Sequence, residues 1–328
     1  MSAPQIIAGR RHRQRRHALV TGVLVLLIAV AYAVTLMVGK TFYSPAEVLA
    51  VIFGDTVPGA SFTVGELRLP RATLALFAGF AFGIAGATFQ TMLRNPLASP
   101  DIIGISSGAS AAAVFGIIVL SLDETAVSLM ALGGALLTAA AIYLLSNRGG
   151  FAGTRLILIG IGVAAMLDSA VTYVLSRAAA WDLQTAMQWL TGSLNGATWA
   201  SVLPVVLSCA LLAPVMLSQN RNLGALRLGD DSAAALGVNV RRTRVLLIVG
   251  AVTLLAFATA AAGPIAFVAF MAGPIAARIV GALLVLVADL IGQFAFDNRY
   301  PVGVVTGVLG APYLIYLLIR TNRSGGSL

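Results

Sequence analysis

The sequence predicts an all-α polytopic membrane protein with about ten transmembrane helices and both chain ends in the cytoplasm. Of its 328 residues, 59% are hydrophobic and only 10% are charged, and the mean hydropathy is +0.95. This composition lies far outside the range of water-soluble domains. The apolar residues form long unbroken runs rather than short alternating segments, which excludes a transmembrane β-barrel.

The apolar runs divide the chain into spans, since each crossing needs roughly 20 apolar residues. The predicted spans cover residues 19–38, 71–93, 101–121, 126–146, 155–176, 199–218, 244–262, 264–279, 282–296 and 302–319. The first run is too long for a signal peptide, so we interpret it as a true span. We expect a basic tail at 1–18, a ten-helix membrane domain at 19–320 and a cytoplasmic tail at 321–328. The link at 280–282 leaves little room for a turn.

The distribution of basic residues gives the orientation. With the first segment inside, sixteen of the 21 Lys and Arg residues lie in cytoplasmic segments, and five lie outside. This asymmetry supports both the span count and the cytoplasmic chain ends. It also explains the net charge of +9 without a nucleic-acid partner. The outward set comprises Lys40, Arg68, Arg71, Arg177 and Arg299.

Small residues inside the spans predict close helix packing. Gly79, Gly83 and Gly86 recur every three or four residues in the second span, as in tightly packed membrane helices. The lone Cys209 lies in an apolar run, so we expect it to be buried. Neither a disulfide framework nor a thiolate metal cluster follows from it.

The cytoplasmic segment 219–244 alternates apolar and charged residues and predicts two short amphipathic helices. Asp230 and Asp231 precede an alanine-rich stretch, where carboxylates favour the start of a helix. Gly237 is a plausible helix stop. Such a pair suits a docking surface for another subunit, with an ordinary solvated loop as the alternative.

On the outer side, Arg68 and Arg71 flank Pro70 at the start of the second span. Two guanidinium groups here can clamp carboxylates of a partner by bidentate hydrogen bonds. Anchoring to lipid phosphates is the alternative, and the residues alone do not separate the two.

At the inner end of the second span, Pro96 and Pro100 lie too close together for one continuous helix. We expect a break there and a new helix capped by Asp101. The next span presents a small polar face that suits either a translocation pathway or close packing. That face comprises Gly104, Ser106, Ser107, Gly108 and Ser110.

Two carboxylates, Asp168 and Asp289, lie within predicted spans. A carboxylate is costly in lipid, so each is a candidate proton or cation site. Structural hydrogen bonding is the interpretation we favour for both. The chain lacks a nucleotide loop of the form GxxxxGK[ST] and a metal-ligand spacing, so we expect it to hydrolyse nothing by itself.

Several ordered motifs give the chain a family resemblance. They are Arg68-Leu69-Pro70-Arg71, Gln90, Asn95-Pro96-Leu97-Ala98 with Pro100 and Gly104, Leu236-Gly237-Val238, Gly263-Pro264-Ile265-Ala266-Phe267-Val268, Ala288-Asp289, Pro301-Val302-Gly303-Val304-Val305-Thr306 and Leu309-Gly310-Ala311-Pro312. On these residues the chain resembles the FecCD-type permeases, the membrane subunits of binding-protein-dependent ABC importers for ferric siderophores, haem and cobalamin.

The resemblance implies partners on both sides of the membrane. Two ATPase subunits would dock inside, a second copy or a homologous permease would complete a central pathway, and a substrate-binding protein would dock outside. Membrane lipids surround the assembly, and no nucleic acid is involved. The chain would bind no cofactor, since ATP and Mg belong to the ATPase. The implied localisation is the bacterial cytoplasmic (inner) membrane.

The resemblance also assigns residues to each role. Docking of the binding protein falls to Arg68, Arg71 and Arg299. Coupling to the ATPase falls to Leu226, Leu228, Asp230, Asp231, Ala235, Leu236, Gly237, Val238, Arg241 and Arg242. The pathway set is Gln90, Asn95, Pro96, Ser106, Ser107, Ser110 and Thr306.

The chain departs from the family pattern at three places. Ile275 stands where relatives usually carry His, and the segment before the ninth span is shorter than usual. Gln293 stands where relatives often carry a third outward arginine, and Arg299 is a candidate substitute for it.

The sequence thus predicts an importer permease that passes a metal chelate inward, with a ferric siderophore as the favoured cargo. Cobalamin and haem are alternatives within the same class. A different class, an ion-coupled secondary transporter using Asp168 or Asp289, stays open.

Overall fold

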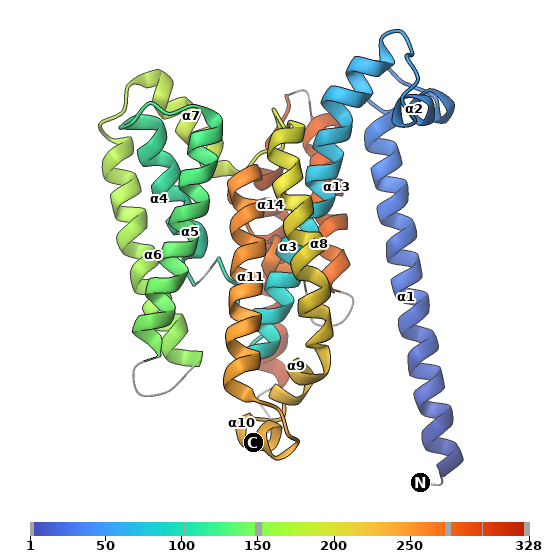
Figure 1. Cartoon of the computed structure of the whole chain (residues 1–328), viewed down its shortest axis with the longest axis vertical. Helices are drawn as coiled ribbons and strands as arrows, with labels where there is room; N and C mark the ends of the chain where they lie inside the picture. Colours follow the sequence, from blue (N-terminus) through green and yellow to red (C-terminus); the bar gives the residue numbers. More distant parts are fainter. Residues whose placement is uncertain (1–2, 102, 148–152, 273–276, 297, 325–328) are drawn as a thin grey trace.

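The computed structural model describes residues 3–101, 103–147, 153–272, 277–296 and 298–324, and every regular element within them is helical (Figure 1). The long helices that match predicted spans are α1 (Ala3–Met37), α3 (Leu69–Met92), α5 (Glu124–Ser146), α6 (Gly153–Leu175), α8 (Trp199–Ser218), α11 (Val240–Ala262) and α14 (Val302–Ser324). Shorter apolar helices are α4 (Ile105–Ile118) and α13 (Ala277–Phe294).

Within the described residues, seven helices are long and apolar enough to cross a membrane. They are α1, α5, α6, α8, α11, α14 and the continuous helix Ser61–Met92, which contains α3. The apolar stretches of α4 and α13 add two shorter segments. The prediction of an all-α polytopic membrane protein is confirmed.

The two ends of the helix bundle carry different elements (Figure 1). At the lower end in the figure lie the start of α1, the short helices α9 (Asn220–Leu226) and α10 (Asp230–Ala235), and the end of α14. At the upper end lie α2 (Pro45–Ile52) and α7 (Ala180–Thr191). Three of the predicted cytoplasmic segments, those at the start of α1, at α9 and α10, and at the end of α14, therefore share one end, in agreement with the basic-residue pattern.

The helix α3 forms the centre of the bundle. About four fifths of its most apolar window is buried (78%), and α11 is similarly covered at 67%. Gly79 faces the backbone of Gly281 on α13, and Gly86 faces the backbone of Ala269. A Cβ atom at either glycine would overlap these backbone atoms, so the predicted small-residue packing is confirmed.

The region between α11 and α13 differs from the prediction. We expected a span at 264–279 and a turn at 280–282, but α13 continues through Val280–Ala282 without a break. Only the single turn α12 (Val268–Met271) forms in the first part of that span. Gly263 and Phe267 have positive φ, which ends α11 and redirects the chain, and Ile275 lies outside the described residues. Hydropathy detects apolar length, whereas this break depends on backbone conformation.

Three upper-end elements were not predicted. The helix α2 begins with a capping box in which Ser44 and Glu47 exchange hydrogen bonds, and the bonds from Ser44 lower the pKa of the Glu47 carboxyl. A π-helical segment, η1 (Ser61–Arg68), leads directly into α3. The helix α7 is amphipathic and too short to span a membrane.

Candidate functional site

Four basic residues meet in one cavity at the upper end of the bundle. Lys40, Arg68, Arg71 and Arg299 line a volume of about 400 Å³ together with Gln293. They come from the segment after α1, from η1, from the start of α3 and from the segment after α13. We call this cavity the upper basic pocket. The structure thus brings together the three arginines predicted to dock a partner.

Arg68 is held by the end of α1. Its Nη1 donates to the carbonyl oxygens of Leu36 and Met37, both at 2.9 Å, and its Nη2 donates to that of Thr41 at 2.6 Å. The guanidinium also lies 5.1 Å from the ring centroid of Tyr43. A cation at the C-terminal end of a helix satisfies carbonyl groups that lack partners within the helix.

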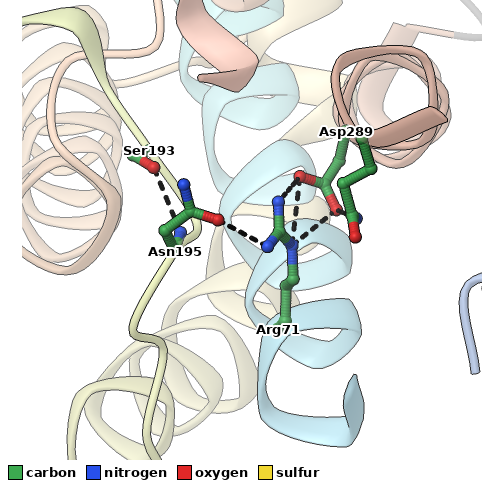
Figure 2. Close-up of polar contacts among 5 residues, drawn as sticks. Arg71, Ser193, Asn195 and Asp289 are labelled. Carbon is green, nitrogen blue, oxygen red and sulfur yellow. Dashed lines mark hydrogen bonds and ion pairs between the residues drawn. The ribbon is translucent and has the colours of Figure 1, made fainter. Parts of the chain in front are cut away.

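Arg71 forms a buried ion pair with Asp289 (Figure 2). Its Nη2 lies 2.7 Å from Oδ1 of Asp289 and its Nε lies 2.9 Å from Oδ2, so the contact is bidentate. Nη1 donates to Oδ1 of Asn195 at 2.6 Å, and Gln293 Nε2 donates to Oδ2 of Asp289 at 2.7 Å. Asp289 is only 1% exposed and the Arg71 side chain 16%.

This cluster gives Asp289 the structural partner that we expected and gives Gln293 a role beside it. Asp289 has a structural partner on another helix, as we favoured, and Gln293 supports the same carboxylate from one turn along α13. Arg68 and Arg71 use their donors within the chain, whereas Arg299 is exposed. The expectation of two outward-pointing guanidiniums does not describe this conformation.

A junction of glycines holds the loop that carries Asn195. Ser193 N donates to Ala262 O at 2.8 Å, and Gly303 N donates to Gly192 O at 3.1 Å. Gly192 has a φ of +70° and lies against the backbone of Pro264. The ends of α7 and α11 and the start of α14 are therefore joined by backbone contacts that leave no space for side chains.

We expect Gly303→Ala to lower stability by about 1–3 kcal/mol, because its Cβ would overlap the carbonyl oxygen of Thr191. Gly307→Ala is the matched control, since it lies one turn further along α14 and its added Cβ would have no neighbouring atom within 4 Å. Thermal unfolding of the purified variants in one detergent measures both. Equal unfolding temperatures for the two variants would contradict the close contact.

The lower end carries the predicted pair of short helices, α9 and α10. Asp230 and Asp231 occupy the first turn of α10, and Gly237 follows its end with a φ of +81°, as expected. Asp230 accepts two hydrogen bonds of 2.9 Å from Nη2 of Arg244 on α11. We call α9, α10 and the residues between them the lower helix pair. Its position is fixed to a buried helix of the bundle.

The predicted coupling residues divide by exposure. Leu228 and Leu236 are each 65% exposed, although both are large and apolar. Leu226 is 1% exposed and packs in the core, so it offers no surface to a partner. The remaining exposed members of the set are Asp231, Ala235, Gly237, Arg241 and Arg242, while Asp230 and Val238 are half-buried.

The predicted pathway residues do not share a free surface. Gln90, Ser110 and Thr306 are buried within the chain. Gln90 Nε2 donates to Phe270 O at 2.8 Å, and Thr306 Oγ1 donates to Gly303 O at 3.1 Å. Polarity along the sequence marks these positions, but it does not reveal which neighbouring helix covers them.

The remaining pathway residues lie in or next to the break before α4. Asn95 Oδ1 accepts a bond from Leu97 N–H, Pro96 is exposed and Ser107 is half-buried. Asp101 does not cap α4, because Gly104 occupies the N-cap position. Instead Asp101 accepts a hydrogen bond of 2.7 Å from Ser106.

Sequence reasoning missed the polar face of α6. Asp168 is exposed, and within the described part of the chain its carboxylate has no hydrogen bond or ion pair. The structural role expected for it is therefore not seen. The signal was present, because exposed polar residues recur beside it at helical spacing from 168 to 177.

Comparison with known proteins places these features in a family. The FecCD transport family model matches residues 25–320. The chain is 42% identical over 301 residues to the ferric enterobactin transport system permease protein FepG of Escherichia coli strain K12, covering 87% of this chain and 91% of that protein. It is 40% identical to the achromobactin transport system permease protein CbrC of Dickeya dadantii strain 3937, covering 92% and 90% of the two chains.

A more distant relative and a solved structure agree. The iron(3+)-hydroxamate import system permease protein FhuG of Bacillus subtilis strain 168 is 35% identical, covering 93% of this chain and 97% of that protein. A solved structure described as an inward-facing metal-chelate type ABC transporter matches with a TM-score of 0.82 at 24% identity, covering 92% and 99% of the two chains. That likeness concerns the fold. The family model and the sequence identities together show that the chain belongs to the FecCD transport family.

Proposed function

We propose that this chain is the permease subunit of an ABC importer that carries a ferric siderophore from a binding protein into the cytoplasm. The observation that carries the proposal is the pairing of the upper basic pocket with the lower helix pair, at opposite ends of a bundle of membrane-spanning helices. Relatives named for ferric enterobactin, achromobactin and iron(3+)-hydroxamate support the cargo class. Cobalamin and haem are the alternatives within this class.

The proposal assigns a partner to each surface. The lower end faces the cytoplasm of a bacterial cell and contacts an ATPase subunit through the lower helix pair. A second permease, either a copy of this chain or a homologue, brings the second ATPase, and the ATPases bind ATP and Mg. The substrate-binding protein docks on the upper basic pocket, and this chain binds no cofactor.

A continuous path of packed helices supports coupling between the two ends. Movement of α10 acts on α11 through the Asp230 to Arg244 ion pair. The helix α11 packs against α3, and α3 carries Arg71 at its upper end. Nucleotide-driven closure below would therefore move the element that forms the pocket above.

The ion-coupled transporter is the weaker alternative. The charge of Asp289 is compensated by the bidentate Arg71 guanidinium, and its carboxylate also accepts a hydrogen bond from Gln293. It is therefore not the unpaired carboxylate that a cation or proton site uses. Asp168 stays a candidate for that class because it is exposed. Changing the exposed Leu228 and Leu236 together to glutamate would spare a secondary transporter and abolish the activity of an ABC permease.

The test of docking uses Arg299→Glu combined with Lys40→Glu, because these two exposed residues of the pocket are not part of the Arg71 cluster. We expect half-maximal stimulation of the ATPase to need about tenfold more binding protein, since like charges placed opposite each other are repulsive. The measurement is ATP hydrolysis by the complex in nanodiscs. Gln184→Glu, an exposed residue of α7 that does not line the pocket, is the matched control for added negative charge.

Unchanged stimulation of the double variant would remove the upper basic pocket as the docking surface. The importer assignment would be overturned by two results together. No ATPase would co-purify with the chain, and vesicles containing this chain as the only protein would take up a ferric chelate on a proton or sodium gradient.

A further inference from the structure

A groove lined by apolar side chains lies between the neighbouring helices α5 and α11 in the lower half of the bundle (Figure 1). Its volume is about 280 Å³. The lining residues come from the second half of α5, between Leu136 and Leu144, and from α11 between Val245 and Thr253. Among these lining residues, Tyr143 and Thr253 alone carry a polar side-chain group. We call this feature the α5–α11 groove.

The groove opens onto the outer surface of the chain. At its edges, Leu144 is 67% exposed and Val249 is 57% exposed. Its wall on α11 runs from Val245 to Thr253, a distance of about 12 Å along the helix. The hydrocarbon core of a bilayer is about 30 Å thick, so the groove has about the depth of one leaflet. Its surroundings are therefore the acyl chains of the lower leaflet, or a protein that replaces them.

Two arginines lie at the lower mouth of the α5–α11 groove. Arg241 and Arg242 precede Val245 by four and three residues, so the row of lining residues on α11 begins between them. Both are exposed, and their guanidinium groups make no hydrogen bond or ion pair with the described residues. On the facing wall, Tyr143 lies three residues before the end of α5, where tyrosines typically meet lipid headgroups. The groove thus has an apolar depth and a positively charged mouth.

A second hollow on the same two helices carries the opposite charge. It lies near the upper end, has a volume of about 160 Å³ and is also lined by α8. Its polar groups are the carboxylate of Glu124 and the hydroxyls of Thr125, Ser128, Thr198 and Ser201. An anionic headgroup would meet a like charge there. Of the two hollows, the lower groove alone combines apolar depth with positive charge, which favours one class of lipid.

An anionic phospholipid matches both parts of the groove. Its acyl chain fills the apolar depth, and its phosphate accepts hydrogen bonds from two guanidinium groups. Basic pockets between membrane helices bind such headgroups, whereas a zwitterionic lipid also carries an ammonium group that the arginines repel. A water-soluble protein would contact the arginines but not the apolar depth. A further membrane helix would cover both leaflets rather than one.

We propose that the α5–α11 groove binds one anionic phospholipid of the lower leaflet, with an acyl chain against Val245 and Val249 and the phosphate between Arg241 and Arg242. This site is separate from the upper basic pocket and does not rest on the proposed function. Because Arg241 and Arg242 also belong to the residues expected to couple to the ATPase, the experiments must distinguish a lipid headgroup from a protein partner.

The selectivity for lipid charge is tested by native mass spectrometry of the full-length chain in detergent, titrated with phosphatidylglycerol or with phosphatidylcholine of the same acyl chains. We expect the first phosphatidylglycerol to bind at least about tenfold more tightly than the first phosphatidylcholine. The double variant Arg241→Gln with Arg242→Gln is expected to lose this preference. Equal affinities in the wild type, or an unchanged preference in this double variant, would overturn the site.

The matched control for charge is Arg221→Gln with Arg227→Gln. Both residues are exposed in or next to α9 at the lower end, and neither lines the groove. The change removes the same charge, so we expect the preference for phosphatidylglycerol to persist. An equal loss in this control would mean that the charge of the whole lower end, rather than the groove, attracts the lipid, and would also overturn the site.

The apolar part of the site is tested by filling the groove. Ala140→Trp and Val249→Trp place an indole in it from opposite walls, and each is expected to weaken phosphatidylglycerol binding at least about tenfold. Both residues are exposed, so neither change disturbs the core, and either variant alone carries the test. Ala141→Trp is the matched control, because Ala141 is exposed on α5 but does not line the groove. Normal binding in both groove variants, or an equal loss in Ala141→Trp, would overturn the groove as the binding site.

Other occupants give different results in the assembled complex in nanodiscs. The arginines belong to the ATPase contact, and the lipid site is overturned, if Arg241→Gln with Arg242→Gln weakens ATPase binding in the absence of anionic lipid but leaves phosphatidylglycerol binding unchanged. The groove is a protein interface if Ala140→Trp separates two permease subunits without affecting lipid binding. The lipid titrations use neither ATP nor uptake, so failure of the importer function leaves the site intact, and loss of lipid selectivity leaves the importer function intact.

Discussion

Replacing Arg71 with methionine is expected to destabilise the protein by about 3–5 kcal/mol, because the change leaves the Asp289 carboxylate buried without its partner. The loss is large because the pair joins α3 to α13, and because Arg71 also holds Asn195 in the loop before α8. The measurement is thermal or denaturant unfolding of the purified chain in one detergent.

The double variant Arg71→Met with Asp289→Leu is the decisive comparison. It removes both charges together, so we expect most of the lost stability to return. It also separates the two roles considered for Arg71. A stable double variant that no longer responds to the binding protein would show that Arg71 acts in docking, whereas one that responds normally would limit Arg71 to holding the helices together. A single Arg71 variant as stable as the wild type would contradict the buried pair.

Changing Leu228 and Leu236 together to glutamate is expected to abolish stable association with the ATPase. Burying a leucine side chain contributes about 1.5–3 kcal/mol, and both side chains are 65% exposed in the isolated chain. Loss of two such contacts weakens binding by at least about a hundredfold. Titration of the ATPase against nanodisc-bound permease measures the change.

The stability of the permease itself should be unaffected by these two substitutions, because neither side chain packs against the bundle. Asn220→Glu, an exposed position on α9, adds a negative charge to the lower helix pair without removing an apolar side chain. We expect it to bind the ATPase nearly normally. Equal weakening by Asn220→Glu would mean that charge, rather than the two leucines, determines docking.

The fold was largely predictable because membrane-spanning helices are recognisable by their apolar length. The prediction was wrong between Gly263 and Gly281, where positive φ values at Gly263 and Phe267 redirect an apolar stretch and α13 continues through the expected turn. It also missed α2, η1 and α7, since short helices at a membrane surface lack the length that hydropathy detects.

The candidate site was predictable in its positions but not in its contacts. The motif with Arg68 and Arg71 correctly located the site at the start of α3. The partner of Arg71, however, lies 218 residues away in the sequence. Structural hydrogen bonding was expected for Asp289, but its partner was not, because a single sequence does not show which helices become neighbours. For Asp168 a structural partner was also expected, but none is present in the described residues. The sequence alone could not show that this carboxylate lies on an exposed face.

The glycine contacts between α3 and α13 restrict how this protein can move. Gly79 and Gly281 bring the two backbones together with no side chain between them, and Gly83 lies at the same contact. Helices in such contact can neither rotate past each other nor separate without opening a cavity. The two helices therefore move as one rigid body, and Arg71 on α3 and Asp289 on α13 both lie at its upper end. A tilt imposed at the lower end would therefore displace the whole ion pair at the pocket, and this contact between α3 and α13 would not act as a hinge.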